Sequence, residues 1–241
     1  PARLTIGQLL TQNISGPRRY GYGTVRDYEI GIKVVLADGR LIKAGGKVVK
    51  NVAGYDLCKL FIGSRGTLGV VVEAVFKLKP IPESETFVQA ESKSLDELDS
   101  LLAAVLDSDL TPMVFDLHNV TTPHAPRTAA ATLVLGFAGA REDVEFQLHK
   151  ASELGIHSPS SLDYQEQYWN GAAAEPVRRT SVLPSELIHC IRRFENVPFV
   201  ARAGNGEIWH RGGPAQAKAN LPCNLLGRVK DTFDPKHILP E

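Results

Sequence analysis

The sequence is poor in cysteine and has no excess of charge of either sign. Its three cysteines, Cys58, Cys190 and Cys223, are scattered among 241 residues and form no C-x-x-C pair. This spacing does not indicate a zinc or iron–sulfur site, and we expect no metal. The 27 lysines and arginines balance the 27 acidic residues, so no net field would recruit nucleic acid or an anionic membrane.

Long apolar runs are also absent. No run approaches the roughly 20 residues of a transmembrane helix, and the opening residues PARLTIGQ contain no apolar signal-peptide core. The unpaired cysteines fit a reducing compartment, so we predict a cytoplasmic protein without a transmembrane segment. His118 and His124 stand on either side of Pro123 and are interpreted as loop histidines rather than metal ligands.

Glycine, in contrast, is dense between residues 45 and 79, where six glycines precede a β-branched run. Apolar residues at helical spacing predict a short helix over 56–62, and Gly63 follows it where a helix C′ glycine belongs. A strand is predicted over 70–78, with Val72, Ala74, Phe76 and Leu78 on one face. Residues 64–69 are then a glycine loop between this helix and this strand.

Two interpretations of the glycine loop stay open on pattern alone. It is neither a P-loop nor a dinucleotide-binding fingerprint, because its glycines precede the strand and no Gly-Lys-Ser/Thr is present. Free backbone amides in such a loop could bind a ligand. A tight crossing between packed elements would need the same glycines.

The ordered run KVVKNVAGYDLCKLFIGSRGTLGVVVEAVFKLKP resembles the end of the FAD-binding domain of vanillyl-alcohol-oxidase-type flavoproteins. Within that superfamily it is most similar to the FAD-binding E subunit of bacterial glycolate oxidase. The motif Gly-Ser-x-Gly-Thr-Leu-Gly runs along the flavin in this family. The resemblance therefore implies FAD as cofactor, with contacts from Gly63, Ser64, Gly66, Thr67, Gly69, Val70 and Val71.

A second part of the resemblance lies near the start. From the residues alone, the Asn/Ser/Gly/Pro cluster at 13–17 is an ordinary turn. The family, however, has a similar segment that touches the pyrophosphate and the isoalloxazine ring. The resemblance thus adds Gly7, Asn13, Ser15, Gly16, Tyr22 and Gly23 to the expected FAD contacts. Leu4 and Gln8 depart from the family by replacing glycines.

The rest of the chain predicts an α+β fold. Alternating residues on both sides of Asp38-Gly39 predict a hairpin with a type I′ turn. After a Pro-rich linker, strands over 86–91, 113–117 and 131–137 alternate with helices over 95–106 and 141–154, the first opened by a Ser94–Glu97 capping box. This order is typical of a ferredoxin-like unit, and the related flavoproteins carry such a cap domain over the substrate. Tyr164, Tyr168 and Trp169 stand at helix spacing and are interpreted as a packed face.

Residues 199–203 and 207–210 predict a second hairpin. Arg202 and His210 lie on its strands and are candidate substrate residues, since arginine can bind a carboxylate and histidine can take a proton. The alternative is that both are ordinary strand residues. The closing Asp-Pro-Lys-His-Ile-Leu-Pro, after a helix over 225–233, resembles the end of the same family. No catalytic residue is assigned.

We therefore predict three parts: the second lobe of a vanillyl-alcohol-oxidase-type FAD-binding domain (1–80), a ferredoxin-like cap (81–198), and a return hairpin with a C-terminal helix (199–241). The family's N-terminal FAD lobe has no counterpart in the sequence. The resemblance implies oxidation of a 2-hydroxy acid by flavin in a complex with other subunits. The alternative is a truncated or non-catalytic assembly subunit that keeps the fold but does not hold FAD alone.

Overall fold

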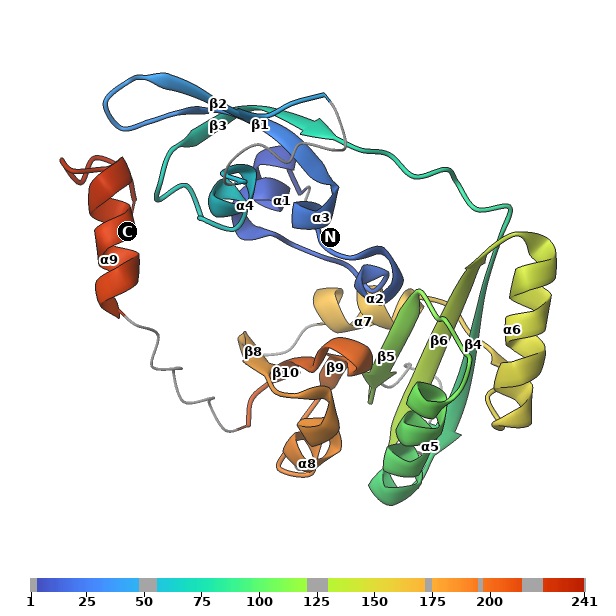
Figure 1. Ribbon diagram of the computed structural model, residues 1–241. Helices are drawn as coiled ribbons and strands as arrows, with labels where there is room; N and C mark the ends of the chain where they lie inside the picture. The colour runs from blue at the N-terminus through green and yellow to red at the C-terminus, as the bar shows by residue number, and fades with distance from the viewer. Residues whose placement is uncertain are drawn as a thin grey trace. The chain divides into compact units, whose positions relative to one another are not determined.

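The chain folds into two compact units in the computed structural model, which describes residues 4–47, 56–120, 130–171, 175–194, 197–213 and 223–240. The smaller unit is made of residues 2–16, 23–80 and 218–241, and the larger unit of residues 17–22 and 81–217. Each unit is thus discontinuous in sequence (Figure 1). The three predicted parts stay a prediction. The boundaries of the two units differ from theirs, because the return hairpin belongs to the larger unit and the last helix to the smaller one.

A three-stranded antiparallel sheet in the order β2-β1-β3 organises the smaller unit. Its elements are α1 (Ile6–Gln12), α3 (Val25–Tyr28), β1 (Glu29–Val35), β2 (Leu41–Gly45), α4 (Cys58–Phe61), β3 (Val70–Phe76) and α9 (Cys223–Phe233). The predicted helix over 56–62 is therefore real but only one turn long. Leu57 precedes it and is 38% exposed.

The hairpin between β1 and β2 forms as predicted, but its turn is not type I′. That turn needs positive φ at both central residues, whereas Gly39 has φ +84° and Asp38 is not in that region. Gly39 N–H donates to the Leu36 carbonyl (3.0 Å), and Leu36 N–H donates to the Arg40 carbonyl (2.9 Å). The chain thus uses a longer turn that ends in a left-handed glycine.

Strand β3 contains a register shift where it pairs with β1, between Lys33 and Val34. Val72 has no partner in this register, which runs from Glu73 directly to Val71. A bulge of this kind changes which side chains face the core. The predicted face is therefore wrong at two positions: Val72 is 55% exposed, and Leu78, beyond the end of the strand, is 90% exposed.

The core of the smaller unit lies between the sheet and the helices. Val34 and Phe61 are fully buried and Leu10 almost so. Phe233 of α9 packs its ring edge-on against Phe61, with 5.5 Å between centroids. The C-terminal helix therefore shares a core with the segment that leads into the glycine loop.

The larger unit has a seven-stranded antiparallel sheet in the order β7-β4-β6-β5-β9-β10-β8. Its elements are α2 (Arg19–Tyr22), β4 (Ser84–Ser92), α5 (Leu95–Asp107), β5 (Val114–His118), β6 (Ala131–Gly139), α6 (Arg141–Glu153), β7 (Ser158–Pro159), α7 (Asp163–Asn170), β8 (Val177–Ser181), η1 (Pro184–Glu186), α8 (Leu187–Ile191), β9 (Phe199–Arg202), η2 (Ala203–Asn205) and β10 (Glu207–Arg211).

The order β4-α5-β5-β6-α6-β7 is the β-α-β-β-α-β sequence of a ferredoxin-like unit. This confirms the predicted α+β class. The return hairpin β9–β10 continues the same sheet by pairing with β5, and β8 closes its far edge. One wide sheet therefore combines the predicted cap and the predicted return.

The two faces of this sheet carry different cores. The main core joins one face to α5, α6 and α8 and includes Phe115, Leu133 and Leu135. The opposite face packs against α7 through Tyr164 and Tyr168, as their helical spacing predicts, while Trp169 stays 42% exposed.

Two further predictions for the larger unit need correction. His118 belongs to β5 and stacks on the Tyr164 ring, so it is not a loop residue; His124 lies outside the described residues. Ser94 caps α5, but Glu97 accepts a hydrogen bond from the Ser92 hydroxyl (2.5 Å) instead of completing a capping box.

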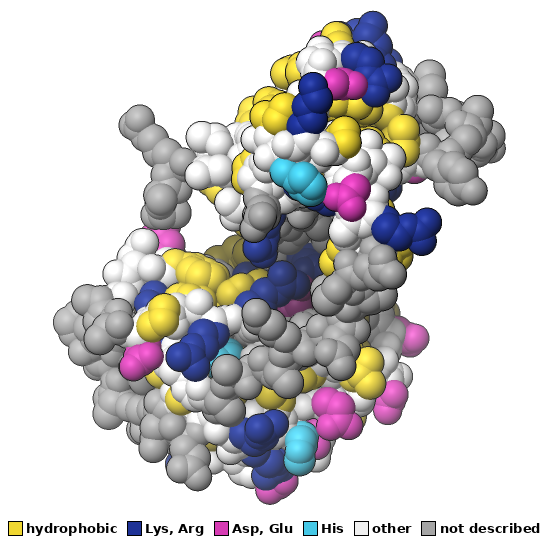
Figure 2. Space-filling model, turned by 90° about the vertical axis from the view of Figure 1, so that its left-hand side faces the viewer, with side chains coloured by type: hydrophobic (Ala, Val, Ile, Leu, Met, Phe, Trp, Pro, Cys, Tyr) yellow, Lys and Arg dark blue, Asp and Glu magenta, His cyan; other side chains and the backbone are white. Residues whose placement is uncertain are grey.

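Side chains of both charge signs are interspersed on the face drawn in Figure 2. In the part of the chain that the structure describes, no helix has both the length and the apolar character needed to cross a membrane.

Candidate functional site

The loop between α4 and β3 forms a tight turn. Thr67 N–H donates to the Ser64 carbonyl (3.0 Å), and the two central residues, Arg65 and Gly66, have φ of +56° and +81°. Positive φ at both positions defines a type I′ turn. A non-glycine residue with positive φ is uncommon, so the surrounding contacts must hold Arg65 in place.

Helix α1 provides two of those contacts. Gly63 N–H donates to the Leu10 carbonyl (2.9 Å), and Arg65 N–H donates to the Thr11 carbonyl (2.8 Å). Both acceptors belong to the last turn of α1, where helix carbonyls lack helical partners. The end of α1 and the start of the glycine loop therefore form one hydrogen-bonded layer.

Helix α1 owes its ends to residues of the N-terminal segment. Thr5 and Gln8 close a capping box, in which Thr5 N–H donates to Gln8 Oε1 (3.0 Å) and Gln8 N–H donates to Thr5 Oγ1 (3.1 Å). Gln8, which replaces a glycine of the family, thus helps to cap the N-terminus of α1. Asn13 ends it in the left-handed region with φ +50°.

The loop amides divide into two groups. Those of Gly63, Ser64, Arg65 and Thr67 donate to protein carbonyls. Among the described residues, no hydrogen-bond acceptor is found for those of Gly66, Leu68 and Gly69. Three amides thus lack an acceptor in the described part of the chain. Open space is found at the side-chain position of Gly66, whereas Leu68 and Gly69 are buried.

The three glycines of the loop are needed for three different reasons. Gly63 has φ +84° and lies close to Asn13, whose Cβ would be 3.4 Å from an added Cβ. Gly66 has φ +81° and open space around the position of a side chain. At Gly69, an added Cβ would lie 2.4 Å from Val34 Cγ1, so this glycine permits tight packing on β1.

Two predicted cofactor residues carry buried polar atoms that lack a partner among the described residues: Asn13 Oδ1 and Ser15 Oγ. Buried polar atoms are normally hydrogen-bonded, and exceptions need an explanation. An amide oxygen and a hydroxyl suit the polar edge of a flavin or a phosphate. The residues present therefore fit such a group.

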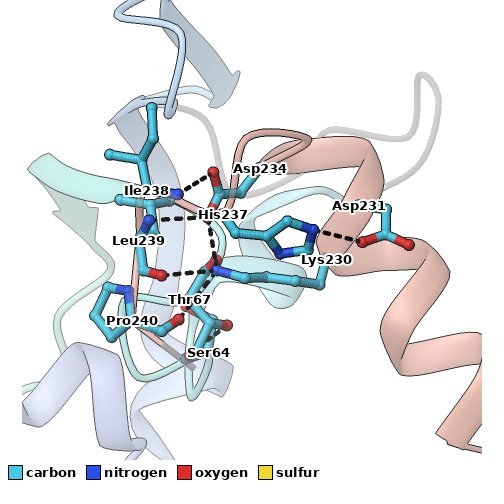
Figure 3. A network of polar contacts seen from close by, with 9 residues as sticks. All are labelled: Ser64, Thr67, Lys230, Asp231, Asp234, His237, Ile238, Leu239 and Pro240. Carbon is cyan, nitrogen blue, oxygen red and sulfur yellow. Dashed lines mark hydrogen bonds and ion pairs between the residues drawn. The ribbon is translucent and has the colours of Figure 1, made fainter.

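The other side of the turn is held by the C-terminal helix and tail (Figure 3). Lys230 Nζ donates to the Thr67 carbonyl (2.9 Å), to Asp234 Oδ2 (2.8 Å), and to the carbonyls of Leu239 (3.2 Å) and Pro240 (3.0 Å). One ammonium group thus joins α9, the chain end and the glycine loop.

Asp234 organises the tail. It is fully buried, and its carboxylate accepts the N–H groups of Ile238 (2.9 Å) and Leu239 (2.8 Å). Burial alone would raise its pKa. The Lys230 ammonium and the two amides outweigh this effect and lower the pKa of Asp234 to about 2.

The remaining predicted cofactor residues are distributed unevenly. Gly7 lies within α1, Ser15 and Gly16 follow that helix, and Gly23 has φ +82° beside Asp27. Val70 is 54% exposed and Val71 packs on the small core. These residues belong to the smaller unit, whereas Tyr22 belongs to the larger unit through α2. Whether FAD touches them stays a prediction.

Arg202 and His210 have internal partners. Arg202 is 3% exposed and forms an ion pair with buried Asp116, and its guanidinium also donates to Gln165 Oε1 (3.1 Å). His210 is fully buried, donates from Nδ1 to the Gly212 carbonyl (2.5 Å), and shares a 2.9 Å hydrogen bond between Nε2 and Thr180 Oγ1. These contacts favour the alternative interpretation, and the substrate role stays untested.

Sequence reasoning missed Lys230 and Asp234, which the structure brings to the loop. Lys230 lies on a predicted helix and Asp234 directly follows it, four residues later, which is a signal for an ion pair. Asp234 also begins the family-like closing motif. Within the described residues, no group of three or more histidine, cysteine, aspartate or glutamate side chains could hold a metal ion.

Comparison with known proteins gives partial relatives. The chain is 37% identical over 159 residues to glycolate oxidase subunit GlcD of Bacillus subtilis, 46% over 76 residues to D-lactate dehydrogenase of Archaeoglobus fulgidus, and 40% over 99 residues to glycolate oxidase subunit GlcE of Escherichia coli. These matches cover 62%, 32% and 41% of this chain, but only 34%, 17% and 28% of the relatives. The chain thus spans about a third or less of their length.

No family model matches the chain. A solved alkyldihydroxyacetonephosphate synthase has a TM-score of 0.70 at 16% sequence identity, over 97% of this chain and 56% of that one. At this identity the likeness concerns the fold alone. The partial relatives are thus glycolate oxidase subunits and a D-lactate dehydrogenase, and the solved synthase shares the fold of this chain.

Proposed function

We propose that the chain is part of an FAD-linked oxidoreductase that acts on a 2-hydroxy acid. The smaller unit would hold the flavin at the Gly63–Gly69 loop, and the larger unit would serve as the cap. The relatives' names support the substrate class, because glycolate and D-lactate are both 2-hydroxy acids. The words "subunit GlcD" and "subunit GlcE" support an assembly with other chains.

The observation that carries this proposal is that the loop has amides without an acceptor and open space at Gly66. The amides of Gly66, Leu68 and Gly69 have no acceptor among the described residues, and the side-chain position of Gly66 is empty. A planar ligand could approach such a backbone closely. When bound, FAD would supply the redox chemistry by accepting a hydride equivalent from the hydroxyl-bearing carbon.

This chain's own residues would bind and orient the cofactor. Asn13 Oδ1 can accept a hydrogen bond, Ser15 Oγ can donate one, and the three loop amides can donate to flavin oxygen or nitrogen atoms. Each hydrogen bond to a neutral group contributes about 0.5–1.5 kcal/mol. We assign no proton-transfer residue, because both ring nitrogens of His210 are already engaged within the larger unit.

A second candidate is a non-catalytic assembly subunit. The observation in its favour is that four loop amides, those of Gly63, Ser64, Arg65 and Thr67, already bind protein carbonyls. A purely structural crossing would use its amides in this way. The two functions differ in whether the purified chain binds FAD.

The substitution G66A, with G39A as its matched control, tests the proposed function. Both glycines belong to the smaller unit, have φ near +80° and have open space around an added Cβ. Each substitution should therefore cost a similar 1–2 kcal/mol or so of stability. Only G66A should weaken FAD binding, by about tenfold or more, because a methyl group would stand where the flavin approaches.

The measurement is a titration of each variant with FAD, followed by flavin fluorescence, beside urea unfolding of the same samples. Equal FAD affinity in G66A and G39A would make the loop structural only. An unmodified chain that ignores added FAD would favour the non-catalytic subunit.

A further inference from the structure

We infer that Lys230 is a positioning residue for the flavin loop: it sets the affinity for FAD without touching FAD. This inference rests on the proposed function. It assigns a role to a residue of the C-terminal helix, far from the glycine motif in sequence. The reason is the hydrogen bond from Lys230 Nζ to the Thr67 carbonyl (2.9 Å), shown in Figure 3.

Lys230 has no donor left for an anionic ligand. An ammonium group has three N–H donors, and Lys230 Nζ has four acceptors within 3.2 Å: the carbonyls of Thr67, Leu239 and Pro240 and the Asp234 carboxylate. Its side chain is only 17% exposed. A direct phosphate contact would require breaking this arrangement, so the role must act through the loop.

The Thr67 carbonyl controls the direction of one of the free amides. The Thr67 C=O and the Leu68 N–H belong to one planar trans peptide, in which the two bonds point in opposite directions. Fixing the carbonyl on Lys230 therefore aims the Leu68 N–H away from α9. That N–H is one of the three loop amides without an acceptor among the described residues.

The remaining bonds of Thr67 leave this peptide little freedom. Both Thr67 N–H and Thr67 Oγ1 donate to the Ser64 carbonyl, at 3.0 and 2.8 Å. The bonds from Thr67 to Ser64 thus close the turn from within, and Lys230 binds the Thr67 carbonyl from outside the turn. Without Lys230, the Thr67–Leu68 peptide could rotate and the strained Arg65 backbone could relax.

The competing explanation is that Lys230 only fastens the C-terminal tail. Asp234→Asn separates the two roles, because it weakens the tail contacts to Lys230, Ile238 and Leu239 but leaves the Lys230–Thr67 bond. Lys33→Met is a matched control, since Lys33 also forms an ion pair in the smaller unit, with Glu73 on the sheet.

The experiment measures amide hydrogen exchange of the full chain without ligand, and FAD affinity, in K230M, D234N and K33M. K230M should speed exchange in residues 63–69 and weaken FAD binding about tenfold or more. D234N should speed exchange mainly in the tail, and K33M should change neither loop nor affinity. K230R keeps the charge and the N–H donors, so it should recover part of the FAD affinity. If K230M does not fold, K230Q takes its place.

Unchanged exchange of residues 63–69 in K230M would overturn the inference. So would faster exchange with unchanged FAD affinity, because Lys230 would then be structural only. If the unmodified chain does not bind FAD at all, the proposed function fails and the cofactor role of Lys230 fails with it, while the exchange data still decide whether Lys230 holds the turn.

Discussion

Residues of the same type have different structural roles in the glycine loop. The three loop glycines have one sequence signature, yet Gly63 ends a helix, Gly66 leaves open space and Gly69 lets β3 pack on Val34. The sequence predicted that the glycines matter. It could not predict which of them borders open space, because that depends on residues brought in from α1 and β1.

The same limit applies to charged residues. Arg202 and His210 are notable in sequence because strands seldom bury such groups. Their partners, Asp116 and Thr180, lie 86 and 30 residues away along the chain. Only the order of strands in the sheet shows that these partners are neighbours.

Asp234 provides a prediction at the scale of a single residue. Its pKa falls from the ordinary value of 3.8 to about 2 in the folded chain, where the carboxylate faces Lys230, with the exposed His237–Asp231 pair nearby. An acid with a lowered folded pKa stabilises the fold above the unfolded pKa, and this contribution is lost as the pH falls through the folded value. We therefore expect the smaller unit to lose stability between about pH 4 and pH 2.

Urea unfolding of the unmodified chain and of D234N across this pH range measures the effect. D234N cannot ionise at this position, so the difference in unfolding free energy between the two proteins should shrink as the pH falls. A difference that stays constant from pH 6 to pH 2 would show that Asp234 does not titrate in this range.

At the scale of elements, most helices and strands follow from sequence pattern. The ferredoxin-like order, both hairpins and the last helix were predicted from periodicity and turn residues. Several details were not. The bulge at Val72 depends on how β3 pairs with β1, and local pattern contains no information about that pairing. Another such detail is the length of α4, which is a single turn, Cys58–Phe61.

The most unexpected element is α2. Residues 17–22 fall inside the segment predicted to touch FAD, yet they belong to the larger unit. Gly21 N–H donates to the Met113 carbonyl (3.1 Å), and the Tyr20 ring packs edge-on against Phe115. Because both neighbouring segments belong to the smaller unit, the chain passes from one unit to the other on each side of this short helix.

Arg18, just before α2, and Arg19, within it, should contribute differently to the stability of the larger unit. Arg19 forms an ion pair with Glu207, which is 3% exposed and also binds Arg179. R19M would leave that buried carboxylate with one partner fewer and should cost about 1.5–3 kcal/mol. Arg18 pairs with Glu85 at a partly exposed site, so R18M should cost about 1 kcal/mol or less.

Urea denaturation of the two variants, followed by tryptophan fluorescence, measures this difference. Both tryptophans, Trp169 and Trp209, belong to the larger unit and report on its unfolding. Equal stability losses in R18M and R19M would mean that the ion pair between Arg19 and buried Glu207 does not hold α2 in the larger unit.

At the scale of the whole molecule, the resemblance indicated more than the residue pattern did. The run around Gly63–Gly69 led to a flavoprotein family, and glycolate oxidase subunits are among the partial relatives. Composition and periodicity alone would have ended at an α+β protein. What no sequence pattern indicated is that α9 returns to the glycine loop through Lys230.

In the proposed function, FAD lies against the free amides of the glycine loop. The most direct test is a ¹H–¹⁵N correlation spectrum of the labelled chain during titration with FAD. We predict the largest shifts at the amides of Gly66, Leu68 and Gly69, with Gly39 and Gly155, two glycines with positive φ elsewhere in the chain, unchanged. Binding of FAD that leaves those three amides unshifted, or no binding at all, would contradict the account.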